Sequence, residues 1–112
     1  MTLRQKQSIF IFLVARLIIF ANENGYELTF GETYRTPEQA DLNANNGIGI
    51  KNSLHTKRLA IDLNLFKNGK YLSTTESHKE LGEWWERQHN NCRWGGRFND
   101  GNHYEFTERA WR

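Results

Sequence analysis

The stretch SLHTKRLAIDLNLF, residues 53–66, decides the fold that we expect of this chain. Between positions 58 and 65, apolar residues alternate with polar or small ones, and one face of the stretch carries Leu59, Ile61, Leu63 and Leu65. This period of two predicts a β-strand with one buried face. Asp62 then lies on the opposite face, where its carboxylate would point into a cleft and a bound cation would stabilise it.

A second polar cluster lies near the C-terminus, in WGGRFNDGNHYEF, residues 94–106. It offers Asp100 and His103 beside the His55 and Asp62 of the first stretch. Two histidines and two carboxylates fit a catalytic zinc with three protein ligands, an open position and a general base. Ordinary explanations remain open for each residue: a surface histidine, a hydrogen bond within the sheet, and an Asp–His pair that holds a turn.

Composition sets limits on the kind of protein. A chain of 112 residues with 38% apolar residues suits a single domain, residues 1–112. The net charge of +2 is spread without any long block of one sign, so nucleic acid is not expected as a partner. The lone Cys92 cannot form an intrachain disulfide, and we expect it to be a buried apolar residue or an inert surface thiol.

Residues 9–21, IFIFLVARLIIFA, resemble a signal peptide in their apolarity. Arg16 interrupts the run, no small-x-small cleavage site follows, and the run is shorter than the roughly 20 residues that a membrane span needs. We therefore expect a buried amphipathic helix and no stable membrane insertion. Without an export signal, the protein would be made in the cytoplasm and would need release by another factor to act outside it.

The remaining elements follow from caps and turns. Three helices are expected, each opened by a capping box. The first covers residues 3–23 after Thr2 with Gln5, the second begins at residue 37 after Thr36 with Gln39, and the third follows Ser73 with Glu76 and ends at about residue 88. Strands are expected at 26–32, around Asp62, at 70–72 after an Asn-Gly turn, and at 103–108, with a loop at 43–53. The fold class is therefore α+β, a small antiparallel sheet with helices packed on one side, and we expect a monomer.

Three sequence elements resemble those of one family. SLHTKRLAID (53–62) resembles the S-x-H-x-x-G-x-A-x-D signature of VanY-like D-alanyl-D-alanine carboxypeptidases and phage L-alanyl-D-glutamate endopeptidases, which are zinc enzymes that cut cell-wall peptides. YRTPEQ (34–39) resembles the tyrosine–arginine element of the family, and WGGRFNDGNHYEF resembles its W-G-G stretch, which ends in an acid-x-x-His pair. Their occurrence in the family's order is more specific than any single element.

The resemblance implies roles for particular residues. His55, Asp62 and His103 would be the zinc ligands, and Asp100 the general base. Arg35 would bind the substrate and polarise its carbonyl. Ser53 matches the serine of the signature, and we interpret it as support for the ligands.

Two departures from the family pattern bear on these roles. Arg58 replaces the glycine of the signature, which would alter the turn between two ligands. Asp100 stands where many relatives have glutamate, and the phage branch often has this aspartate. We therefore expect a phage lysis enzyme, an endolysin, that cleaves the L-Ala–D-Glu bond of peptidoglycan stem peptides.

Other functions stay open at this point. A D-alanyl-D-alanine carboxypeptidase would need a cation for the free carboxylate of its substrate, either Arg35 or Arg58. A zinc-stabilised wall-binding module without catalysis and a cysteine peptidase that uses Cys92 with His89 are further alternatives.

Three more titratable residues lie near these elements. Glu105 ranks second to Asp100 as the base, because alternation places it on the same strand face as His103. His78 and His89 are expected to be solvated, since they lie among charged residues of a predicted helix.

Overall fold

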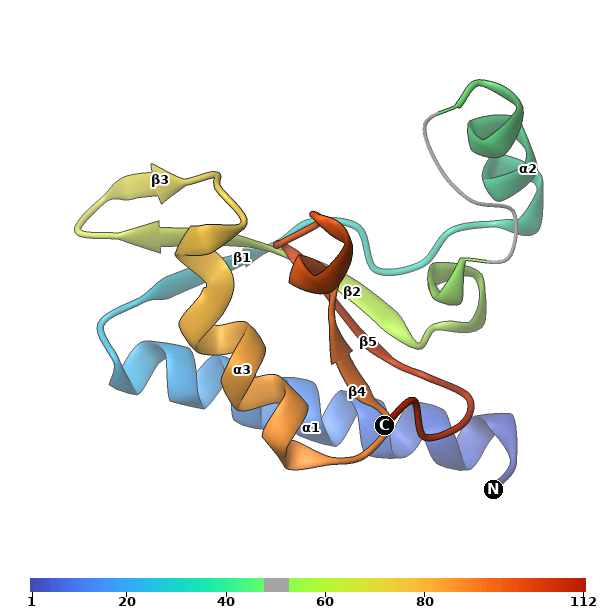
Figure 1. The fold of residues 1–112 in the computed structure, drawn as a ribbon, viewed down its shortest axis with the longest axis horizontal. Coiled ribbons are helices and arrows are strands. Elements are labelled where there is room, and N and C mark those ends of the chain that lie inside the picture. The colour runs from blue at the N-terminus through green and yellow to red at the C-terminus, as the bar shows by residue number, and fades with distance from the viewer. Residues whose placement is uncertain (48–52) are drawn as a thin grey trace.

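Strand β2 (Ala60–Lys67) is the central strand of the sheet, and its alternating pattern predicted a strand here with one buried face. Strand β1 (Glu27–Phe30) pairs with its second half. Strands β5 (His103–Phe106) and β3 (Lys70–Leu72) pair with its first and last residues. Strand β4 (Cys92–Trp94) completes the order β1-β2-β5-β4, with β3 beside β2, and every pairing is antiparallel. Figure 1 shows this arrangement.

The computed structural model describes residues 1–47 and 53–112. Its helices are α1 (Leu3–Glu23), α2 (Pro37–Asn45) and α3 (Lys79–Gln88), with 3₁₀ turns η1 (Leu54–Lys57), η2 (Glu76–His78) and η3 (Gly95–Phe98). Helices and an antiparallel sheet confirm the α+β class. No helix within the described ranges is long and apolar enough to cross a membrane.

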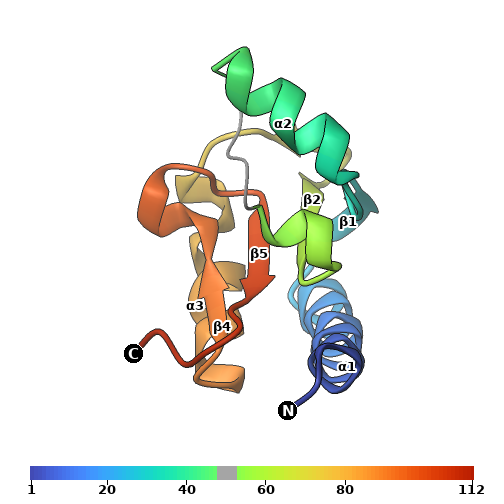
Figure 2. The ribbon, with the colours of Figure 1, turned by 90° about the vertical axis from the view of Figure 1, so that its right-hand side faces the viewer.

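The core lies between one face of the sheet and the helices α1 and α3. Leu59 and the apolar face of β2 meet side chains of both helices there, together with Tyr104 and Phe106 of β5. Trp85 of α3 is fully buried, and its neighbour Trp84 is partly buried at the rim. Figure 2 shows α2 at the opposite end of the molecule from α1, outside this layer. The predicted packing on one side therefore holds for α1 and α3.

Local signals placed most of the elements correctly. The capping box of Thr2 and Gln5 opens α1. Asn68 and Gly69 both have positive φ, 53° and 77°, which is the geometry of the predicted Asn-Gly hairpin between β2 and β3. The predicted loop at 43–53 starts later, because α2 continues to Asn45, and its residues 48–52 lie outside the described part of the chain.

Two predicted caps differ from the structure. Thr36 accepts a hydrogen bond from the backbone of Gln39, but the Gln39 side chain bonds Asn43 and leaves the box half formed. The box predicted at Ser73 is wrong. Thr74 caps that turn instead, through the backbone N–H of Ser77, and η2 precedes α3.

Candidate metal centre

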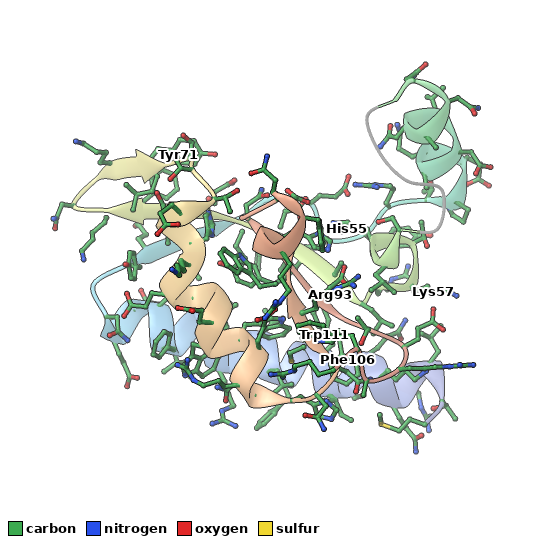
Figure 3. The ribbon with its side chains drawn as sticks, in the orientation of Figure 1. His55, Lys57, Tyr71, Arg93, Phe106 and Trp111 are labelled. Carbon is green, nitrogen blue, oxygen red and sulfur yellow. The ribbon has the colours of Figure 1, made fainter. Side chains whose placement is uncertain are left out.

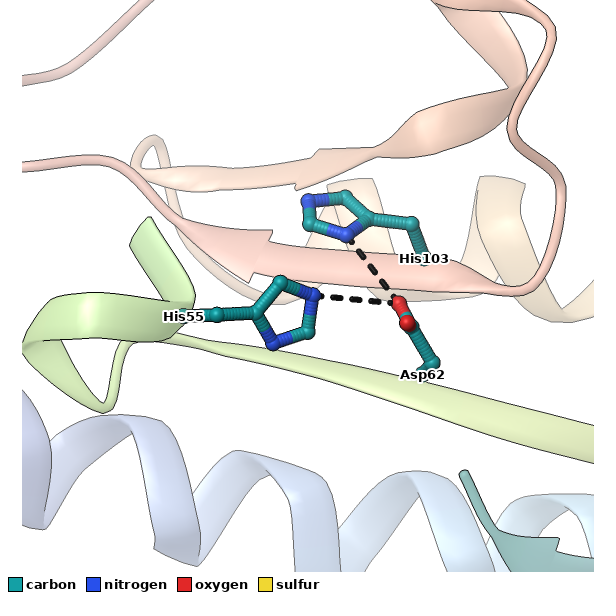
Figure 4. A group of neighbouring side chains, drawn as sticks. All are labelled: His55, Asp62 and His103. Carbon is teal, nitrogen blue, oxygen red and sulfur yellow. Dashed lines mark hydrogen bonds and ion pairs between the residues drawn. The ribbon is translucent and has the colours of Figure 1, made fainter. Parts of the chain in front are cut away.

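Three side chains from separate elements converge on the open face of the sheet. His55 comes from η1, Asp62 from β2 and His103 from β5, and their ligand atoms all lie within 4.8 Å of one another. Oδ1 of Asp62 lies 3.2 Å from Nε2 of His55 and 3.2 Å from Nδ1 of His103. Figure 4 shows both imidazole rings directed at this carboxylate.

The strand register places two of the three residues side by side. Asp62 of β2 is the direct partner of His103 of β5. Both point away from the core, because Ile61 and Tyr104, which precede and follow them on their strands, are buried against the helices. Alternation along β2 thus predicted the correct face for Asp62, and the antiparallel pairing brings His103 to it.

The turn between β2 and the preceding 3₁₀ helix positions His55. The Ser53 hydroxyl accepts a hydrogen bond from the backbone N–H of His55 at 3.2 Å, so Ser53 supports the backbone of this ligand rather than its ring. Arg58 ends η1 in the left-handed region, with φ 57° and ψ 37°. The turn that glycine makes in the family signature is therefore kept here by an arginine, whose guanidinium stacks 4.0 Å from the centre of the Tyr34 ring.

Hydrogen bonds at the far side of each ring fix which nitrogen faces the centre. Nδ1 of His55 lies 3.1 Å from the carbonyl oxygen of Thr33, which can only accept, so this nitrogen carries the proton and Nε2 is left for a ligand. Nε2 of His103 lies 2.7 Å from Oε1 of Glu105, which turns Nδ1 toward Asp62. The two histidines thus present different ring nitrogens.

Against the effect of burial, the charged groups around the centre lower the pKa values of Asp62 and Glu105 and so keep both carboxylates ionised. Burial raises the pKa of Asp62, but hydrogen bonds from His103 and His55 outweigh it and hold the pKa at about 2. Burial lowers the pKa of His103, whereas its bonds to Asp62 and Glu105 raise it to about 9. Burial also raises the pKa of Glu105, and its bonds to His103 and Arg93 more than reverse this.

This donor set fits a zinc ion. Ligand atoms at about 2.0–2.2 Å from a tetrahedral Zn²⁺ lie roughly 3.3 Å apart, and the two His–Asp separations are 3.2 Å. Two imidazoles and a carboxylate are common ligands of catalytic zinc, and both rings are already held by partners on their far sides. His55, Asp62 and His103 could therefore hold the metal.

Asp100 lies at the rim of the centre. Its Oδ2 is 3.9 Å from Nδ1 of His103, and half of its side chain is exposed. Partial burial raises its pKa. The turn that carries it is held by Trp94, whose indole N–H donates to the carbonyl of Gly101 at 2.7 Å. A Cβ at Gly96 would come within 2.3 Å of the Trp94 ring, so the ring packs directly against the backbone of this turn.

Arg35 borders the same space. Its backbone N–H donates to the carbonyl of His55 at 3.2 Å. Burial raises the pKa of Asp100, and the positive charge of Arg35 is among the influences that partly offset this rise. The guanidinium pairs with Glu32, while its buried Nε has no hydrogen-bond partner among the described residues. Oε1 of Glu32 is also 3.7 Å from Nδ1 of His55.

Sequence reasoning missed two supporting carboxylates. Glu32 precedes the Tyr-Arg element, and nothing in its local pattern predicts contact with His55 and Arg35. The sequence suggests Glu105 only as a rival base, but it is buried between His103 and Arg93 and contacts the far side of the His103 ring. Its position two residues after His103, on the same strand face, was the signal that could have shown this role.

Two further expectations are wrong. His78 is buried rather than solvated, 2.8 Å from the hydroxyl of Tyr104, and burial lowers its pKa to about 4. The cysteine peptidase alternative also fails, because Cys92 is a fully buried core residue and burial raises the pKa of its thiol to about 12. His89 is only half-buried, and its ring packs on Phe106.

Comparison with known families gives one match. The sequence profile of a peptidase family described as D-alanyl-D-alanine carboxypeptidase, one of the M15 peptidases, matches residues 47–106, which is more than half of the chain. The matched segment contains the three candidate ligands and Asp100. No curated protein is significantly similar to the chain.

Proposed function

Because the chain belongs to the D-alanyl-D-alanine carboxypeptidase family of M15 peptidases, we propose that it is a zinc-dependent peptidoglycan hydrolase that cleaves the L-Ala–D-Glu bond of stem peptides. M15 peptidases are zinc enzymes, and the family implies a peptidoglycan substrate. The observation that carries the proposal is the convergence of His55, Asp62 and His103 within the matched segment.

In this proposal the three converging side chains hold Zn²⁺ through Nε2 of His55, Oδ1 of Asp62 and Nδ1 of His103. The bound ion would supply Lewis acidity, polarising the scissile carbonyl and lowering the pKa of water toward about 7. Glu105 and the carbonyl of Thr33 keep the two rings oriented from behind.

Asp100 is the proposed general base and acid. It lies at the rim of the centre, close to a ligand ring and half exposed, so it can reach both solvent and a bound peptide. It would take a proton from the attacking water and return it to the amine that leaves when the C–N bond breaks. Its raised pKa makes it a stronger base for the first of these two transfers.

Arg35 is the proposed electrostatic stabiliser. Its buried Nε–H has no partner among the described residues, and the charge of the side chain acts on the space around Asp100. A substrate carbonyl that gains negative charge during attack would be a suitable acceptor for this donor. Glu32 holds the guanidinium from its other side.

The pairing of the cations supports the endopeptidase over the exopeptidase. A carboxypeptidase needs a cation for the free carboxylate of its substrate. Arg35 is already paired with Glu32, and Arg58 stacks on Tyr34 in a groove beside α1. The carboxylate of Glu32 offsets the charge of Arg35 toward a second carboxylate. Arg58 lines the groove beside α1, whose lining residues do not include the three converging side chains. The family description nevertheless makes terminal D-Ala removal the alternative to be tested.

We further propose that the enzyme acts as a monomer in phage lysis, on the periplasmic wall, once another factor gives it access. A wall-binding module without catalysis is the remaining alternative. The proposed base Asp100 argues against it, because zinc binding alone would not need a carboxylate beside the ligands.

Mass spectrometry of fragments from purified peptidoglycan tests the proposed reaction. The zinc-loaded protein should release peptides with new D-Glu amino termini, and His55→Ala and Asp100→Asn variants should release none. Loss of terminal D-Ala alone would replace the proposal by the carboxypeptidase. Wall binding without any metal-dependent product would leave the binding module.

A further inference from the structure

The outer face of α1 is apolar and has no protein partner in the described structure. One side of the helix packs on the core, while Ile11, Phe12 and Ile19 on the other are 68%, 62% and 58% exposed. Helical spacing places them on one stripe with positions 4, 8, 15 and 16. We call these seven positions the outer face. Large exposed apolar side chains gathered on one surface mark an interaction site.

The charges of the outer face have a single sign. Arg4 and Arg16 are exposed on it and form no ion pair with another described residue. No aspartate or glutamate occurs before Glu23. The apolar stripe is thus accompanied only by cations over its whole length.

A groove beside the helix extends this surface. It has a volume of about 470 Å³, lies between α1 and the segment from β1 to Tyr34, and has Arg4 and Arg58 among its lining residues. Phe30, which also lines it, is 67% exposed. The groove therefore repeats the combination of apolar side chains and guanidinium groups.

From this combination we propose that the outer face of α1 adsorbs to the surface of an anionic phospholipid bilayer. Helices with exposed aromatic and aliphatic residues bordered by Arg bind at the headgroup boundary, and each cation near an anionic surface contributes. A second copy of the chain would offer two more arginines over residues 4–19 and no acid to pair with them. Phosphate headgroups would balance the positive charge of the arginines, and the boundary between headgroups and acyl chains would bury the apolar side chains.

The arrangement of the fold agrees with such adsorption. Helix α1 covers the core face of the sheet, and the three converging side chains lie on the opposite face. In Figure 3, His55 lies on the other side of the sheet from α1. Adsorption through α1 would leave the candidate metal centre directed away from the lipid. The inference rests on α1 and the groove beside it, and it does not depend on the proposed peptidase activity.

Co-sedimentation with vesicles tests the inference. The whole protein should bind vesicles of phosphatidylglycerol and phosphatidylcholine, and not vesicles of phosphatidylcholine alone, and high salt should release it. The double variant Phe12→Gln, Ile19→Gln should bind at least about tenfold more weakly. Arg4→Gln or Arg16→Gln should each weaken binding about fivefold.

Matched controls lie elsewhere on the surface. Tyr71, 56% exposed on the β2–β3 hairpin, and Arg87 of α3 should be replaceable by Gln without effect on sedimentation. Unchanged binding in the α1 variants, or equal binding to neutral vesicles, would overturn the inference. So would a dimer in light scattering that the double variant abolishes, because the face would then serve a second copy.

Discussion

Glu105 stands directly behind a ligand ring: its Oε1 lies 2.7 Å from Nε2 of His103, on the far side of the imidazole from Asp62. Burial raises the pKa of Glu105, but its bonds to His103 and Arg93 outweigh this and lower the pKa, so it is an ionised carboxylate that can only accept. Nε2 of His103 therefore carries a proton, and Nδ1 is the nitrogen that faces the centre. Arg93 holds the other carboxylate oxygen of Glu105 at 2.7 Å. The atom of His103 that faces the candidate metal centre is thus selected by a residue on the far side of the ring.

Replacing this carboxylate should weaken zinc binding. Glu105→Ala should lower zinc affinity about 10- to 100-fold, since the ring loses the partner that sets its orientation and tautomer. Glu105→Gln keeps an acceptor for the ring N–H and should recover part of the loss. Competition with a chromophoric chelator measures the affinity, with the exposed Glu83→Ala as the control. Equal affinities in wild type and Glu105→Ala would refute a positioning role.

Zinc should stabilise the fold. The three candidate ligands come from three separate elements, so only the folded protein presents them together. Zinc at 100 times its dissociation constant should add about 2.7 kcal/mol to the free energy of unfolding. Thermal unfolding with and without a chelator measures this increment, which His55→Ala should largely remove. A thermal midpoint that does not change when the chelator is added would show that the three side chains hold no metal.

Acid should destabilise the protein in part through His78. Its folded pKa of about 4 lies below the ordinary 6.5, so the unfolded chain takes up this proton first as the pH falls. The stabilising contribution is complete above about pH 6.5 and is lost as the pH falls toward 4, by about 2 kcal/mol between pH 7 and 5. In the His78→Gln variant, the free energy of unfolding should change less with pH between about 7 and 5. Urea unfolding with chelator present measures this. Parallel pH curves for the two proteins would contradict the assignment.

The left-handed turn at Arg58 should still prefer glycine. Any side chain with a Cβ costs about 1 kcal/mol at φ 57°, and both Arg58→Gly and Arg58→Ala remove the stack on Tyr34. The glycine variant should therefore be more stable than the alanine variant by about 1 kcal/mol in urea unfolding. Equal stabilities would mean that this backbone conformation carries no strain.

Sequence by itself determined the elements and the donors of the site. Alternation in β2, the capping box at Thr2 and the Asn-Gly hairpin are local signals, so they identified their elements without tertiary information. The resemblance of three sequence elements to the peptidase family grouped His55, Asp62 and His103 as candidate ligands, and the strand period placed Asp62 on the face away from the core. The structure brings these three side chains together.

Only the tertiary structure decided which groups stand behind those donors. Glu32, Glu105 and Thr33 reach the ligand rings through strand pairing and loop packing that join residues far apart in the chain, and no local pattern encodes such contacts. The same holds for His78, whose charged neighbours in sequence predicted exposure, while packing against Tyr104 buries it. Burial and partner choice depend on the whole fold, because solvent exclusion at one residue is created by the elements that cover it.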